Sequence, residues 1–189
     1  MTKHCVALLA VALTVAGSIG GAQAENKPTT GEAASVRSGL HDFDFEFGSW
    51  KVHHRVKRAN GEWLEFDGTC ITHGLMGGAG NVEEHTFNKA DGVTYGVALR
   101  AYDAKTNKWA IWWVDGRAPH GPLDPPTVGT FENGVGTFYW EGDFNGKRLR
   151  ARAVWSQITP TTAHWEQANL LDDGKTWEPN WVMEFQRTK

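Results

Sequence analysis

The chain has 189 residues, a formal net charge of −3, 10 tryptophans, 22 glycines and 2 cysteines. This length is typical of one compact domain whose core is large enough to fold unaided. A weakly acidic chain without clusters of basic residues is a poor nucleic-acid binder, so nucleic acid is not an expected partner.

Residues 1–24 predict a secretory signal peptide. Lys3 and His4 form a short basic start, residues 6–16 form a nearly unbroken apolar run, and residues 22–24 read Ala-Gln-Ala, which is typical of a cleavage site. The run is too short to span a membrane, and no run of membrane length follows it, so we expect no membrane insertion. The sequence therefore predicts a periplasmic or secreted protein.

The cysteines and the next segment add to this expectation. Cys5 lies in the predicted signal peptide, which leaves Cys70 as the only thiol of the mature chain. A single cysteine excludes an internal disulfide, and on the same count we expect no cysteine-based metal cluster. Residues 25–39 are small and polar and predict a flexible tether, followed by one domain over residues 40–189.

From residue 40 onward, aromatic and β-branched runs alternate with short Gly, Asn and Asp turns, and no stretch keeps a helical apolar spacing. Strands are expected near residues 49–58, 63–72, 80–88, 93–103, 108–115, 127–132, 135–144, 147–156, 163–171 and 177–187. About ten antiparallel strands in chain order form an up-and-down meander. Such a meander either splits into two sheets or closes into a barrel, and closure removes the exposed edges.

The turns predict the pairing of neighbouring strands. A three-residue loop at residues 59–61 places His54 and Cys70 on an inner, apolar face. A two-residue loop at residues 145–146 places Phe138 and Trp140 inside as well. The outer faces then carry opposed polar pairs: His53–Asp67, Arg55–Glu65, Asp143–Arg148, Glu141–Arg150 and Tyr139–Arg152. We interpret the arginines as a solvated surface; an arginine cluster for an anionic ligand is the alternative.

The hairpin at Asp91-Gly92 sets Glu83 opposite Arg100 and Glu84 opposite Leu99. Glu84 then shares a mainly apolar face with Leu99 and Trp112, and we expect that face to point inward.

The last hairpin leaves two registers open. A two-residue loop at Asp173-Gly174 points His164 inward, whereas a three-residue loop pairs Trp165 with Trp181 and turns His164 outward. The aromatic pairing favours the second register.

Gly48 and Trp50 begin the first predicted strand, and Arg187 ends the last. These two ends of the meander resemble the lipocalin and wider calycin pattern. The resemblance implies that Trp50 plugs the closed end of a barrel and that Arg187 lies across its ring, where a cation–π contact is favourable. More closely, residues 43–187 look like a bacterial secreted family of unknown function with a calycin-like barrel. The stretches that carry this likeness are residues 43–50, 102–115, 129–134 and 173–178, with Arg187.

Motifs for established chemistries are missing, including zinc-protease, nucleophile-elbow, phosphate-loop and dinucleotide patterns, so we expect no cofactor and no metal. The loop over residues 115–127 holds four prolines and is either a rigid connector or a rim over the barrel mouth.

The leading hypothesis is a barrel that binds a small apolar or aromatic molecule. Its expected lining is His54, Glu84, Trp112, Phe138 and Trp140, with His164 if the last hairpin takes the first register. One alternative is a cofactor-independent lyase or isomerase with His54 and Glu84 as acid and base. The other is a filled barrel that serves as a structural or partner-binding module. The sequence does not define the oligomeric state.

Overall fold

The computed structural model describes residues 38–144 and 147–188, so the predicted signal peptide and nearly all of the predicted tether lie outside the described residues. The strands are β1 (Gly48–Lys57), β2 (Trp63–Leu75), β3 (Gly80–Lys89), β4 (Gly92–Asp103), β5 (Lys108–Asp115), β6 (Thr127–Glu132), β7 (Val135–Phe144), β8 (Lys147–Ser156), β9 (Thr162–Leu170) and β10 (Trp177–Arg187). Short 3-10 turns occur at η1 (Asp44–Glu46) and η2 (Met76–Gly78).

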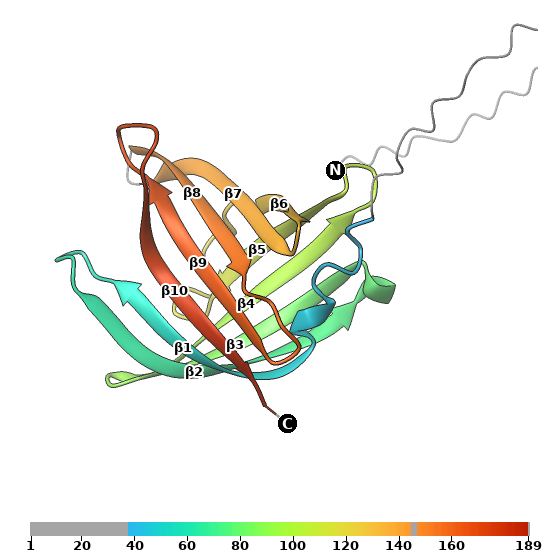
Figure 1. Cartoon of the computed structure of the whole chain (residues 1–189). Helices are drawn as coiled ribbons and strands as arrows, with labels where there is room; N and C mark the ends of the chain where they lie inside the picture. The colour runs from blue at the N-terminus through green and yellow to red at the C-terminus, as the bar shows by residue number, and fades with distance from the viewer. Residues whose placement is uncertain (1–37, 145–146, 189) are drawn as a thin grey trace, which may run out of the picture. The chain divides into compact units, whose positions relative to one another are not determined.

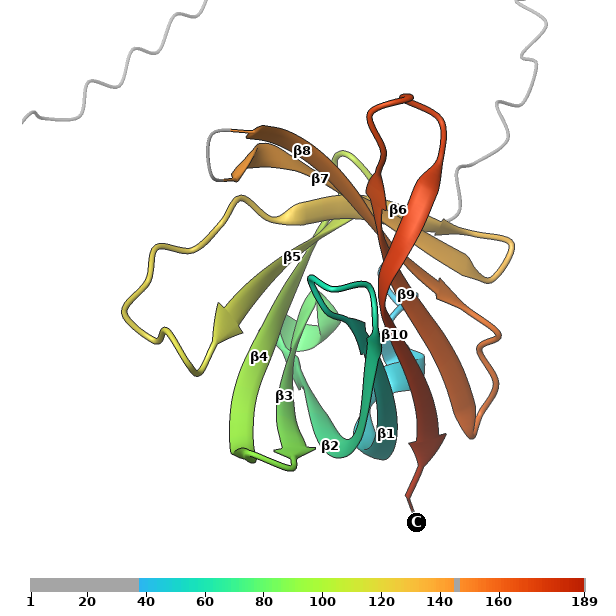
Figure 2. The same cartoon turned by 90° about the vertical axis from the view of Figure 1, so that its left-hand side faces the viewer.

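The ten strands form a closed antiparallel barrel in which each strand pairs with its neighbours in the chain and β10 returns to pair with β1. Figures 1 and 2 show the strands curling round until the first and last meet. The predicted up-and-down, lipocalin-like barrel is therefore confirmed. Within the described part of the chain, no helix has the length and apolarity needed to cross a membrane.

The two hairpin registers that were predicted from clean alternation are confirmed. In the β1–β2 pair, His53 faces Asp67 and Arg55 faces Glu65. Gly61 closes the turn with φ +86°, a conformation that glycine adopts without strain. In the β7–β8 pair, Glu141 faces Arg150 on the outer side, although the turn residues 145–146 themselves lie outside the described part.

The β3–β4 hairpin corrects the sequence interpretation. Its turn lies one residue earlier, with Lys89 opposite Gly92, which keeps the predicted grouping of side chains on each face. The apolar-looking face with Glu84 and Leu99 points outward, and both residues are exposed. Glu83, on the other face, is buried. The prediction failed because it assumed that the more apolar face of β3 is the buried one. The polar side chains of the other face can be buried because they satisfy one another inside the barrel.

The last hairpin follows neither simple register along its whole length. Trp177 pairs with Leu170 near the turn, and a bulge between Pro179 and Trp181 then shifts the pairing by one residue. Beyond the bulge His164 pairs with Glu184, and its ring lies on the outer side. A bulge of this kind exchanges the two faces of a strand partway along it.

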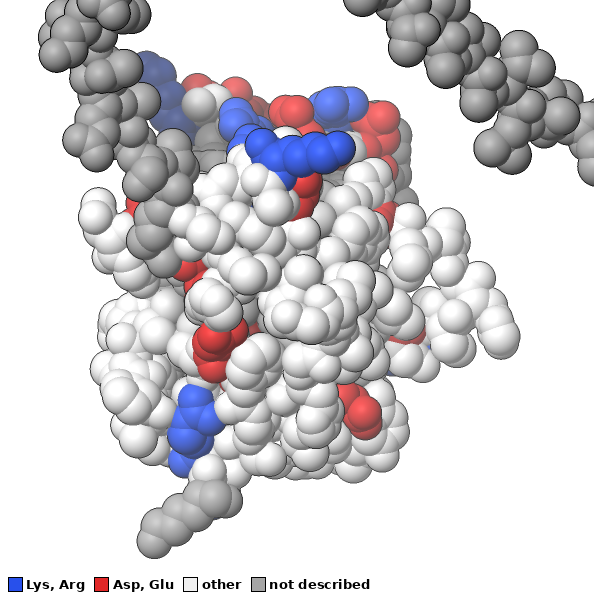
Figure 3. Space-filling view, turned by 90° about the vertical axis from the view of Figure 1, so that its right-hand side faces the viewer, with Lys and Arg blue, Asp and Glu red and all other residues white. Residues whose placement is uncertain are grey.

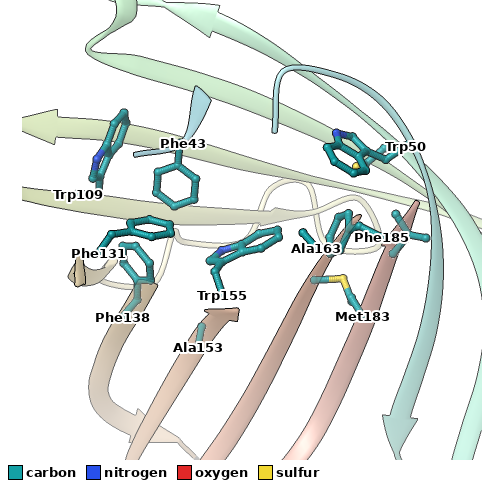
Figure 4. Packing of buried hydrophobic residues seen from close by; sticks show 12 residues of the cluster. Phe43, Trp50, Trp109, Phe131, Phe138, Ala153, Trp155, Ala163, Met183 and Phe185 are labelled. Atoms are coloured by element: carbon teal, nitrogen blue, oxygen red, sulfur yellow. The ribbon is translucent and has the colours of Figure 1, made fainter. Parts of the chain in front are cut away.

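An aromatic core fills one part of the barrel (Figure 4). Phe43, from the segment ahead of β1, inserts among strand residues, with its ring 5.0 Å from the rings of both Trp109 and Phe131. The main-chain carbonyl of Gly39 accepts a hydrogen bond from Trp109 Nε1 at 2.9 Å. The end of the predicted tether is thus held by the barrel and is part of its core structure.

The face of the barrel drawn in Figure 3 is mostly uncharged. Several basic and acidic side chains gather along its upper edge, and the charged side chains below them are isolated.

Candidate functional site

The barrel holds a cavity of about 440 Å³ inside its wall. Asp124 and Pro125, from the proline-rich connection between β5 and β6, line its edge, so this loop forms part of a rim. Trp155 and Met183 belong both to the aromatic core and to the lining, so the cavity directly adjoins the core. The remaining tryptophans of the lining are Trp113, Trp140, Trp165 and Trp181.

Small inward-facing residues leave room for this cavity. A Cβ atom built on Gly96 would lie 2.2 Å from Trp113 Cζ2, and one built on Gly142 would lie 2.4 Å from Trp140 Cζ2. The two indoles therefore lie flat over glycines, along the wall, where a larger neighbour would push them into the lumen. Ala98 and Ala151 line the same space.

Two tryptophans of the lining carry buried nitrogen atoms without partners. The indole nitrogens of Trp140 and Trp155 are buried and have no hydrogen-bond partner among the described residues. Gln167 Nε2 donates to Asn180 Oδ1 at 3.0 Å across the lining. Buried donors without acceptors cost free energy.

A buried charged cluster lies beside the cavity, and Glu83, His85 and Arg100 belong to its lining. Arg100, on β4, bonds to the Glu83 carboxylate from β3 and lies 2.5 Å from Glu46 Oε2 in η1. It also donates to Asn81 Oδ1 at 3.0 Å. His85 Nε2 lies 2.9 Å from Glu83 Oε1. All five residues are at most 2% exposed.

The two carboxyl groups of this cluster differ in their pKa values. Burial opposes ionisation of Glu83, but the charges of His85 and Arg100 outweigh it and lower the pKa of Glu83. For Glu46, burial dominates over the attraction of Arg100, and repulsion from Glu83 adds to it, so the pKa of Glu46 is raised well above its usual value. Arg100 thus stabilises the ionised form of Glu83, and the carboxyl group of Glu46 is the more basic of the two.

His54 is fully buried inside the barrel, as predicted, but it lies behind the cavity wall. Its Nδ1 accepts a hydrogen bond from Trp181 Nε1 at 3.3 Å, and its ring stacks on Phe66 with 4.8 Å between centroids. Burial, with repulsion from His85 and His53, lowers the pKa of His54 to about 3. The imidazole is therefore neutral and serves as an acceptor that orients Trp181.

The other predicted lining residues are distributed unevenly. Trp140 lines the cavity, whereas Phe138 is completely buried in the aromatic core. Trp112 and Glu84 lie on the outer side of the barrel, because the β3–β5 faces are reversed relative to the expectation. His164 is also outside, where its Nδ1 lies 2.7 Å from Glu184 Oε1. Hence Glu84 and His54 do not form an acid–base pair.

The sequence did not reveal the cluster itself. The predicted register set Glu83 opposite Arg100, whereas in the structure Glu83 pairs with Ala98. The Glu83 and Arg100 side chains still meet, on the inner side of the barrel. The signal was present as alternation, because Asn81, Glu83 and His85 occupy successive positions on one face of β3. The alternation along β3 could not indicate Glu46, which contacts Arg100 from a segment far away in the sequence.

The comparisons with known proteins support the fold alone. No protein-family model and no curated protein matches the chain. An S-type phycobiliprotein lyase from Guillardia theta superposes with a TM-score of 0.56 at 11% identity, over 81% of this chain and 94% of the lyase. A redesigned β-barrel aligns with a TM-score of 0.44 at 9% identity, over 82% of this chain and 100% of its own. At this level of identity, the chain shares the closed antiparallel barrel of the lyase.

Proposed function

We propose that the protein binds a small aromatic molecule in the barrel lumen. The observation that carries this proposal is the cavity of about 440 Å³, which is walled by five tryptophans and lies within the size range of small-molecule sites, roughly 300–1,000 Å³. A filled structural barrel would have no such space. The likeness to the barrel of a phycobiliprotein lyase also supports a ligand-binding use of the fold.

The lining defines the chemistry of the ligand. Indole faces favour a flat ring system, since aromatic rings stack offset or edge to face. Gln167 and Asn180 form a polar side that orients it.

Two measurements test the binding proposal. A native mass spectrum of the purified protein is expected to show a co-purified small molecule. If the protein is empty, its lumen is expected to take up 1-aminoanthracene. Binding of this dye is followed by quenching of tryptophan fluorescence. Ala151→Leu places a larger side chain in the lumen and should abolish uptake, whereas Ala110→Leu on the outer face of β5 should not. Equal uptake by both variants contradicts the proposal, and so does a wild type that carries no co-purified molecule and takes up no dye.

A second candidate function is acid–base catalysis on the bound molecule, and His85 is the residue that favours it. Glu83, anchored by Arg100, holds His85 Nε2, while His85 Nδ1 has no hydrogen-bond partner among the described residues. A carboxylate that orients one imidazole nitrogen leaves the other able to accept or deliver a proton. This pair takes the place of the expected His54 and Glu84 in a lyase or isomerase reaction.

The two functions are separated by following any bound molecule over time by mass spectrometry or, for an isomer, by chromatography. Catalysis predicts that the wild type converts the molecule and that His85→Gln binds it without conversion. His53→Gln, an exposed histidine on β1, is the matched control and should behave like the wild type. A wild type that releases every bound molecule unchanged leaves binding as the function.

We also propose that the protein acts after export, on the basis of the signal-like residues 1–24. The full chain expressed in a bacterial host should yield a periplasmic protein whose intact mass lacks these residues. An uncleaved chain in the cytoplasm would contradict export and leave the binding proposal standing.

A further inference from the structure

The buried cluster brings together three side chains that are common ligands of transition metals. Cys70 on β2 and the pair Glu83 and His85 on β3 each offer one donor atom, and these atoms lie within 4.8 Å of one another. All three residues are at most 2% exposed. They converge because β2 and β3 are paired, with Cys70 directly opposite His85.

The charges around this point leave room for a cation. Glu46 and Glu83 bring two carboxyl groups, and among the described residues Arg100 is the one guanidinium that contacts both. The cluster therefore has one carboxyl group more than it has guanidinium groups. An uncompensated buried charge is expensive, so the surplus is neutralised by a proton or by a bound cation.

A divalent ion balances the cluster when Cys70 binds as a thiolate. Two carboxylates and a thiolate then face Arg100 and the ion, and positive and negative charges are equal. Binding releases to solvent the thiol proton and any proton that the carboxyl groups of the cluster hold.

We propose that Cys70, Glu83 and His85 form a Zn²⁺ site in the barrel wall. Thiolate, imidazole and carboxylate are the donors that Zn²⁺ prefers, and three protein ligands leave one coordination position for water or a ligand. Glu83 and His85 line the cavity, so that position faces the lumen. Arg100 holds the second carboxylate oxygen of Glu83, as outer-shell partners do in metal sites. Cysteine counting alone excluded multi-cysteine clusters, but a mixed site needs only one thiol.

The test is a titration of the chelator-treated full-length protein with Co²⁺, which replaces Zn²⁺ and reports its ligands by absorption. We expect one equivalent to bind with a thiolate-to-cobalt charge-transfer band, and Zn²⁺ to displace it. Cys70→Ser, which keeps the size of the side chain, should remove the band. It should also weaken binding by at least the roughly 10–100-fold that loss of an outer-shell partner costs.

Adjacent residues provide a matched pair of variants. Glu83→Gln should weaken Co²⁺ binding, whereas Glu84→Gln, exposed on the same strand, should leave it unchanged. The proposal is overturned if the folded wild type binds no Co²⁺, because the surplus charge is then neutralised by a proton. It is equally overturned if Co²⁺ binds without the thiolate band. Neither result bears on uptake of the aromatic probe, so this proposal and the binding proposal fail independently.

Discussion

The guanidinium carbon of Arg187 lies 4.1 Å from the ring centroid of Trp50, at the seam where β10 meets β1. The same guanidinium donates to the main-chain carbonyl oxygens of Phe47 and Pro160, and Trp50 Nε1 donates to the carbonyl of Glu46 at 2.8 Å. The pair therefore closes the barrel and also fixes the segment that carries Phe43 and Glu46 into it.

Removing this arginine should destabilise the whole barrel. Arg187→Ala loses the cation–π contact and the charge-assisted hydrogen bonds, and we expect the free energy of unfolding to fall by about 3 kcal/mol. Urea denaturation followed by tryptophan fluorescence measures this change. Gln186→Ala, at the exposed neighbouring position, should change it by less than about 0.5 kcal/mol. Similar values for the two variants would show that the seam contributes little.

Arg100 is expected to be essential for folding because it compensates buried carboxylates. Arg100→Met leaves Glu46 and Glu83 without a cation and should cost about 3–5 kcal/mol of unfolding free energy. Adding Glu46→Gln and Glu83→Gln to the same chain should recover much of this loss in denaturation experiments. Arg148→Met, on the exposed ladder of β8, is the control. If the triple variant is no more stable than Arg100→Met, the unpaired buried carboxylates are not the cause of the lost stability.

His54 predicts a pH dependence of stability. Its pKa of about 3 in the folded protein lies below its ordinary value of 6.5, so the unfolded chain binds the extra proton between these values. The stabilisation is fully present above pH 6.5 and is lost as pH falls toward 3, by up to about 1.4 kcal/mol per pH unit. His54→Gln should flatten this slope in denaturation curves at several pH values, and His53→Gln should not. If the dependence of unfolding free energy on pH is unchanged in His54→Gln, that dependence arises from other titratable groups.

The glycines beneath the cavity tryptophans should control access to the lumen. Gly96→Ala places a methyl group against Trp113 and Gly142→Ala places one against Trp140, so each indole must move toward the lumen. Affinity for 1-aminoanthracene should fall at least tenfold, or about 1.4 kcal/mol. Gly74→Ala, whose Cβ would lie 3.5 Å from Phe47, is the control. Unchanged affinity in both cavity variants would mean that the probe binds elsewhere.

Local patterns in the sequence determined the barrel and two of the four hairpin registers that were predicted. Asn-Gly and Asp-Gly steps occur between strands of alternating character, so the β1–β2 and β7–β8 registers follow from counting residues away from each turn. The resemblance of Gly48, Trp50 and Arg187 to the lipocalin pattern implied that the two ends would meet, and Trp50 does pair with Arg187.

Only the tertiary structure decided which face of β3 points inward and where the cavity lies. Glu83 and His85 are buried because Arg100 and Glu46 compensate them, and Glu46 comes from a segment outside the sheet. His164 was turned outward by a bulge at Asn180 that no turn motif marks. The lumen itself depends on small residues from β4, β7 and β8 that become neighbours only on closure. Side-chain alternation within a strand is a local property, whereas burial of a charge depends on partners brought from elsewhere in the chain.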